Sequence, residues 1–134
     1  MSGRRRALLD TSVLIDYPGD QVARVADELA VSAVSTAELH YGVSATADPL
    51  EQLRRRQRLR LVHDLYDVLP FDAQVAEYYG ALATAVRVYG RDPRPRRMDL
   101  QIAATAARNG LTLLTRNAAD FAGLEQALEI IELG

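Results

Sequence analysis

The sequence predicts an α/β protein with three layers, in which a central parallel sheet of about five strands is covered by helices on both faces. Short apolar runs alternate along the chain with longer segments of helical pattern. Strands that are apolar throughout are typical of a sheet that is buried on both sides. The length of 134 residues, with 49% hydrophobic and 25% charged residues, suits a single domain over residues 1–134.

The first strand and the first two helices are expected before residue 31. The apolar run at residues 7–9 predicts a strand, and the polar residues after it favour a turn and a short helix over residues 13–15 that ends before Pro18. Residues 22–30 predict a second helix, because apolar residues recur there on one helical face. These apolar residues are Val22, Val25, Ala26 and Leu29.

A second strand is expected at residues 31–34, followed by a helix over residues 35–47 and a longer helix over residues 50–65. Four leucines of the longer helix are expected to face inward: Leu50, Leu53, Leu61 and Leu65. Five arginines between residues 54 and 60 are expected to form a mostly solvated face.

The second half of the chain repeats the alternation of strands and helices. Its expected elements are a strand at 68–71, a helix at 72–88, a loop at 89–98, a helix at 99–109, and strands at 111–115 and 128–133. Gly110 suits a left-handed cap at the end of a helix. The helix at 72–88 carries an apolar row that meets the core, a second copy of the chain or a partner: Val75, Tyr79, Leu82 and Val86.

Composition excludes several classes of protein. The absence of cysteine excludes disulfides, thiolate metal sites and cysteine nucleophiles. The absence of lysine excludes a Walker phosphate loop and a Schiff-base enzyme. The two histidines, His40 and His63, leave little room for a zinc site and are expected to be structural or surface residues. The net charge of −2 argues against a surface that is positive throughout.

No stretch of the sequence is long and apolar enough to predict a membrane span. The apolar run near the start is interrupted at Asp10, which argues against a signal peptide. We therefore expect a cytoplasmic protein.

Four acidic residues are expected at one edge of the sheet. Asp10 follows the first strand, Glu38 follows the second, Asp99 opens the helix before the fourth, and Asp120 lies just beyond the fourth. Ligands of such sheets bind beyond the carboxyl ends of the strands. Each acid alone has an alternative explanation as a helix cap, and the segment from Ser35 to Glu38 reads as a capping box. Together, carboxylates that converge repel one another unless a cation lies between them.

Oxygen ligands without cysteine or clustered histidine suit Mg²⁺ or Mn²⁺ rather than Zn²⁺. The four segments that hold these acids also resemble the motifs of PIN-domain ribonucleases, and more narrowly those of VapC toxins of bacterial toxin–antitoxin pairs. The segments are Asp10–Asp16, Ser35–Gly42, Asp99–Ala106 and Leu114–Phe121. They occur in the family's order, over a resemblance that runs from about residue 7 to residue 133.

The resemblance implies a PIN fold and metal-dependent endonucleolytic cleavage of RNA by the toxin of a VapBC module, which inhibits translation and growth. It assigns Asp10, Glu38 and Asp99 as catalytic, metal-binding acids. We favour Asp120 for the fourth position, with Asn117 as a polar helper. Thr11, Ser12 and Thr115 are expected to orient carboxylates or bind phosphate, or only to form turns and caps.

Arginines beside the motifs are the candidates for contact with RNA. They are Arg94, Arg96 and Arg97, together with Arg91, in the loop before Asp99, and Arg116 beside the fourth motif. Positive charge at the rim of an acidic pocket attracts a polyanion. The resemblance also implies a VapB-type antitoxin whose tail covers apolar helices near the pocket, an RNA substrate of the tRNA or rRNA class, and a homodimer.

Two other classes remain as alternatives. One is a catalytically inactive PIN-like module that binds a partner protein or RNA, in which the acids are only caps. The other is a phosphoacceptor receiver, which shares the fold class and an acidic pocket. The absence of lysine argues against the receiver.

Overall fold

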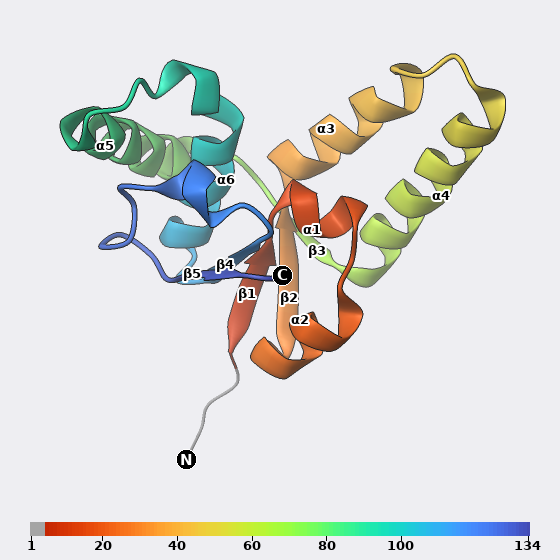
Figure 1. The fold of residues 1–134 in the computed structure, drawn as a ribbon, viewed down its shortest axis with the longest axis horizontal. Coiled ribbons are helices and arrows are strands. Elements are labelled where there is room, and N and C mark those ends of the chain that lie inside the picture. The colour runs from red at the N-terminus through yellow and green to blue at the C-terminus, as the bar shows by residue number, and fades with distance from the viewer. Residues whose placement is uncertain (1–4) are drawn as a thin grey trace.

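The computed structural model describes residues 5–134, whose strands form one parallel sheet in the order β3-β2-β1-β4-β5 (Figure 1). The strands are β1 Arg6–Leu9, β2 Glu28–Ser32, β3 Asp67–Leu69, β4 Thr112–Thr115 and β5 Ile130–Glu132. Each neighbouring pair is parallel. The carboxyl ends of all five strands therefore lie at one edge of the sheet.

Helices cover both faces of this sheet (Figure 1). They are α1 Thr11–Ile15, α2 Gly19–Val25, α3 Ala33–Ser44, α4 Pro49–Leu65, α5 Ala73–Tyr89 and α6 Arg97–Arg108, with short 3₁₀ turns η1 Arg94–Arg96 and η2 Ala118–Phe121. None of the helices within residues 5–134 is long and apolar enough to cross a membrane. The predicted fold class, a three-layer α/β/α arrangement around five parallel strands, is confirmed.

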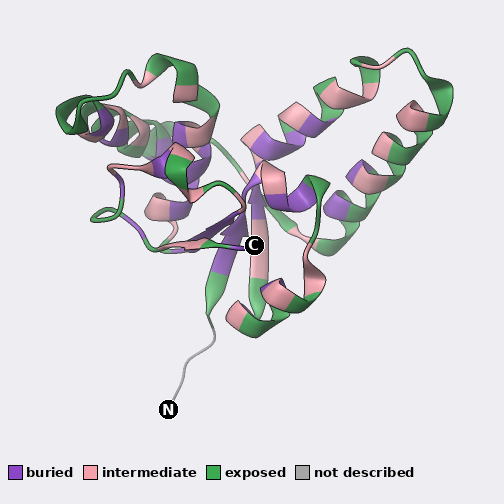
Figure 2. Ribbon diagram, viewed as in Figure 1, coloured by how far each residue is buried: buried purple, intermediate pink, exposed green. Residues whose placement is uncertain are grey.

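The central strand β1 supplies side chains to both cores. Leu8 packs with residues of α5 and α6, whereas Ala7 and Leu9 pack on the opposite face with residues of α1 to α4. All three side chains are fully buried, and Figure 2 shows the buried residues concentrated in the sheet and on the inner sides of the helices. This alternation follows from the two-residue period of a strand.

The apolar row of α5 meets the core of its own chain. Val75, Leu82 and Val86 are buried, and Tyr79 packs against them from a partly buried position. This row is therefore not available to a second copy or to a partner. At the end of α6, Gly110 has a φ of +66° and so provides the predicted left-handed cap.

The predicted helix over residues 22–30 is wrong in its second half. The helix ends at Val25, and β2 begins at Glu28 rather than at residue 31. Glu28 to Val31 pair with Arg6 to Leu9 of β1, so the sheet takes residues whose local pattern also suits a helix. β3 and β5 are shorter than predicted, and β1 and β4 agree with the prediction to within one residue.

The four leucines of α4 that were expected to face inward are exposed instead. Leu50 is 65% exposed, Leu53 48%, Leu61 57% and Leu65 67%. The buried residues of α4 are Leu59 and Val62. The helix packs beside α3 (Figure 1), and this contact buries one side of α4 but leaves its other leucines exposed. The exposed leucines are therefore an apolar surface on this part of the molecule.

Candidate active site

Asp10 lies directly after β1 and is held by two hydroxyl groups. Its backbone N–H donates to Leu114 O at 2.9 Å, which continues the pairing of β1 with β4. Its side chain is buried, and Oδ2 accepts hydrogen bonds from Ser12 at 2.8 Å and Thr115 at 2.9 Å. Asp10 occupies the position before α1 without a capping hydrogen bond from its side chain. Its carboxylate therefore has no role as a helix cap.

Glu38 points toward Thr11, and it lies further from the start of its helix than the sequence predicted. The capping box over Ser35 and Glu38 is wrong, because α3 begins at residue 33 and its cap is Ser32, whose Oγ accepts from Val34 N at 3.0 Å. Ser35 instead lies buried inside the helix, 2.9 Å from Thr11 Oγ1. Thr11 donates to Glu38 Oε1 at 2.7 Å. These contacts join α1 to α3.

Asp99 and Asp120 share one arginine. Asp99 lies in the first turn of α6, and Asp120 lies in η2. Arg96 Nη1 is 2.8 Å from Asp120 Oδ1 and 3.8 Å from Asp99 Oδ2. The two acids are thus brought to the same place from segments on either side of β4.

The pKa shifts indicate that the four acids lie within electrostatic range of one another. Burial, as the largest cause, together with the charges of Asp10 and Asp120 and a smaller effect of Glu38, raises the pKa of Asp99 to about 6, with Arg96 opposing the increase. Burial also raises the pKa of Glu38, against the hydrogen bond from Thr11 and together with the charge of Asp10. The ionised form of the cluster is therefore destabilised, and a bound cation would relieve that repulsion.

The chemistry of these donors fits a hard divalent cation. All four side chains offer carboxylate oxygens, which Mg²⁺ and Mn²⁺ prefer, and the only two histidines lie elsewhere. Within residues 5–134, no three acidic or histidine side chains already surround one point as metal ligands do. Instead, the guanidinium of Arg96 supplies positive charge between two of the carboxylates.

The predicted supporting residues lie beside the acids. Thr11, Ser12 and Thr115 contact them through their hydroxyl groups. Asn117 contributes its backbone: its N–H donates to Thr115 Oγ1 at 3.1 Å, and its carbonyl accepts from Asp120 N at 3.0 Å. The side chain of Asn117 is exposed. Asn117 therefore shapes the turn after β4.

Of the arginines predicted to contact RNA, Arg96 alone is paired with an acid of the cluster in the described part of the chain. Arg94 pairs with Asp92 at 3.0 Å, and Arg116 lies 3.5 Å from Asp16. Arg91 donates to Ala119 O at 2.8 Å. Arg97 is exposed at the start of α6. The loop thus carries positive charge beside the acids without pairing all of it with them.

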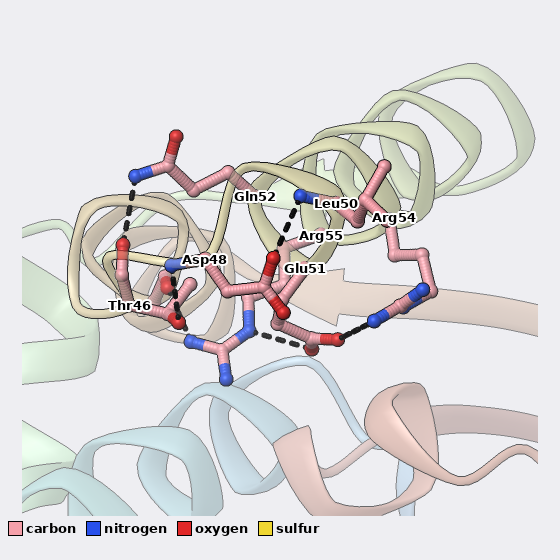
Figure 3. A network of polar contacts seen from close by, with 8 residues as sticks. Thr46, Asp48, Leu50, Glu51, Gln52, Arg54 and Arg55 are labelled. Atoms are coloured by element: carbon pink, nitrogen blue, oxygen red, sulfur yellow. Dashed lines mark hydrogen bonds and ion pairs between the residues drawn. The ribbon is translucent and has the colours of Figure 1, made fainter.

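Two arginines of α4 also reach the site, although the sequence pattern predicts a solvated face for them. Arg55 and Arg58 line a cavity of about 320 Å³ together with Thr11 and Glu38. Arg55 is engaged, because it donates to Glu51 at 3.0 Å and to Gly42 O at 2.6 Å (Figure 3). Among residues 5–134, Arg58 has no ion-pair partner. The spacing of three residues between them, beside buried Leu59, was the available signal.

Comparisons with known proteins agree with this geometry. The PIN domain family matches residues 7–125. Ribonuclease VapC5 of Mycobacterium tuberculosis is 36% identical over 126 residues, which is 92% of this chain and 90% of the relative. Toxin FitB of Neisseria gonorrhoeae is 29% identical over 133 residues, covering 90% of this chain and 94% of that toxin.

Solved structures of VapBC and FitAB proteins are also similar to this chain. The crystal structure of VapBC-5 from Mycobacterium tuberculosis matches with a TM-score of 0.83 and 35% identity over 96% of this chain and 98% of that chain. FitAcB from Neisseria gonorrhoeae matches with a TM-score of 0.77 and 26% identity over 94% and 96% of the two chains. The chain belongs to the PIN-domain family. Within that family it is a VapC-type ribonuclease, the toxin of a VapBC module.

Proposed function

We propose that this chain hydrolyses phosphodiester bonds of RNA with Mg²⁺ or Mn²⁺ held by Asp10, Glu38, Asp99 and Asp120, and that the cleavage inhibits translation and growth. One observation supports this most directly: at the carboxyl edge of the sheet, the charges of acids from three other segments raise the pKa of Asp99. A mutual repulsion of this kind has a clear use in binding a cation and no use in capping helices.

The acids have different roles in this proposal. Asp10 and Asp99 are direct metal ligands, and Ser12 and Thr115 fix the orientation of Asp10. Glu38 is a ligand or the base that accepts the proton of the attacking water, a role that its raised pKa favours. Asp120 completes the metal's surroundings. When bound, the metal supplies positive charge at the phosphate and makes water a better nucleophile.

The arginines guide the RNA to these acids. We place phosphate contacts at Arg58, which lines the same cavity as Glu38, and at Arg94, Arg96, Arg97 and Arg116. With a metal held by the acids, Arg96 would be available to pair with phosphate instead of Asp120. Since RNA carries a charge at every linkage, an unpaired guanidinium in the cavity provides affinity that depends on salt. The substrate class is tRNA or rRNA, which places the activity in the cytoplasm.

The partner is a VapB-type antitoxin that covers the groove between α1 and α4. This groove measures about 500 Å³ and is lined largely by apolar side chains, including Ile15, Leu61 and Leu65, each more than half exposed. The similar structure of VapBC-5 is named as a member of a family of toxin–antitoxin systems, and another similar structure is named as a toxin–antitoxin complex from Klebsiella pneumoniae. An amphipathic segment of an antitoxin would bury these side chains. We also propose a homodimer, which sedimentation of the purified chain would test.

Cleavage of RNA by the purified chain, followed by sequencing of the RNA ends, tests the proposal. We expect discrete cuts that need Mg²⁺ or Mn²⁺ and disappear in Asp10→Asn and Asp99→Asn, while circular dichroism shows an unchanged fold. The exposed Asp64→Asn is the matched control and should cut normally. If the folded double variant still cut the same RNA, the assignment of these acids would be wrong.

A further inference from the structure

The only two histidines of the chain lie against each other on its surface. His40 is on α3 and His63 is on α4, and their Nε2 atoms are 3.4 Å apart. Their ring centres are 5.5 Å apart, with the planes inclined at 54°. The Nε2 atoms are closer to each other than the ring centres are, so each imidazole turns its Nε2 toward the other ring.

This separation matches two nitrogen ligands of one tetrahedral ion. With zinc–nitrogen bonds of about 2.0–2.1 Å and a tetrahedral angle, the two nitrogens lie about 3.3–3.4 Å apart. An octahedral ion with adjacent ligands at the same bond lengths would bring them to about 2.9 Å. The observed distance, at which the two imidazoles are also within hydrogen-bond range of each other, thus fits tetrahedral Zn²⁺ without movement of either helix.

The surroundings of the pair separate it from the acidic site. The two histidines line an open cavity of about 460 Å³ whose other lining residues are Val43, Arg56, Leu59 and Arg60. None of these lining residues carries a carboxylate, so Mg²⁺ and Mn²⁺ find no preferred ligand there. Imidazole nitrogen instead suits zinc. The two arginines oppose a cation, although their exposed charges are screened by solvent.

We propose that His40 and His63 chelate one Zn²⁺ ion, with water in the remaining positions, and that the ion links α3 to α4. Both histidines are exposed, so the site is accessible to metal from solution. Binding to the folded chain alone would stabilise the hairpin of α3 and α4. The inference depends only on the histidine geometry and is independent of the proposed cleavage of RNA.

Titration of the full chain with Zn²⁺ in excess Mg²⁺ tests the site, because Mg²⁺ competes for any site made of carboxylates. Calorimetry should show one zinc per chain, and His40→Gln and His63→Gln should each weaken binding by about tenfold or more, since two linked ligands bind better than one. Asp99→Asn is the matched control and should retain this zinc. In nitrogen NMR, the imidazole resonances of both histidines should shift together as Zn²⁺ is added.

Three results would overturn the proposal. Equal zinc affinity in the wild-type chain and both histidine variants would place the ion elsewhere. A shift of one imidazole alone would exclude chelation. Zinc-dependent dimers in sedimentation, with half an ion per chain, would mean that the metal joins two copies rather than two helices. Both substitutions are on the surface, and thermal unfolding of the metal-free variants checks that they fold.

Discussion

The hydroxyl of Thr115 donates a hydrogen bond of 2.9 Å to Oδ2 of Asp10, and this contact joins the end of β4 to the end of β1. Thr115 is fully buried, and Asp10 is nearly so. The same carboxylate oxygen accepts from Ser12. A carboxylate held by two hydroxyl groups loses little freedom on binding a cation, so the sheet itself orients the first acid of the site.

Removal of this contact should weaken metal binding. Thr115→Val keeps the shape of the side chain but leaves Asp10 with one hydroxyl partner. We expect Mg²⁺-dependent cleavage to fall by about 10-fold to 100-fold at limiting metal, as for other groups that orient a ligand. The measurement is the cleavage rate against metal concentration.

The matched control for this substitution is Thr112→Val. Thr112 lies on the same strand, but its hydroxyl donates to Glu129 Oε1 at 2.7 Å. The control should show the wild-type dependence on metal. Equal losses in the two variants would mean that general damage to β4, and not the orientation of Asp10, lowers the activity.

The stability of the metal-free chain should increase on mild acidification. The pKa of Asp99 rises from 3.8 to about 6 on folding, so the folded chain binds a proton that the unfolded chain releases. The resulting stabilisation is complete below pH 3.8 and is lost as pH rises through 6. Between pH 7 and pH 5 we expect a gain of about 1 kcal/mol in the free energy of unfolding, measured with urea in EDTA.

Asp99→Asn should remove most of this dependence of stability on pH, because the carboxyl group with the raised pKa is then absent. At pH 7 the variant should be more stable than the wild-type chain in EDTA, while it loses cleavage. Asp64→Asn, on the exposed side of α4, should leave the pH dependence intact. Equal stability of the wild-type chain at pH 5 and pH 7 in EDTA would argue against a raised pKa of Asp99.

Arg96 should compete with the metal. Its guanidinium contacts Asp120 and lies near Asp99, so Arg96→Gln removes a positive charge from the metal's position. We expect Mn²⁺ to bind about tenfold more tightly, as measured by calorimetry. Arg94→Gln is the control, because Arg94 pairs with Asp92 instead. Equal gains in the two variants would indicate a general effect of charge in the loop.

Arg58 should contribute to the binding of RNA. In an Asp10→Asn background, which prevents cleavage, Arg58→Gln should weaken RNA binding and lower the slope of log affinity against log salt by about 0.7, as expected for one lost phosphate contact with a single strand. Arg60→Gln, on the exposed surface of the same helix, is the control. An unchanged salt slope for Arg58→Gln would remove Arg58 from the RNA path.

The sequence predicted the acidic edge well, because parallel strands bring their carboxyl ends together whatever lies between them. It did not predict the neighbours of Glu38. Ser35 looks like a helix cap in the sequence. However, β2 ends at Ser32 and α3 begins at the next residue, so Ser32 is the cap instead. The sequence also could not reveal which side of α4 is buried, since leucines surround Leu59 and Val62 and only contact with α3 selects among them.

Arg96 illustrates a second limit. Its place in the loop indicated a role near the pocket, but loop residues have no period from which a direction follows. Only the structure shows that its guanidinium pairs with Asp120. The start of β2 shows a similar limit. Residues 28–30 suit either a helix or a strand locally, and their pairing with β1 makes them a strand.

The order of strands in the sheet has a consequence for how such a toxin is made. β1 lies in the middle and needs β4, from the last quarter of the chain, before the edge that carries Asp10 is complete. Asp120 is translated later still. Chains fold from the N-terminus as they leave the ribosome, so a nascent chain lacks part of the cluster until the segment that holds Asp120 has emerged. The four acids therefore come together only in a chain that has been extended beyond Asp120.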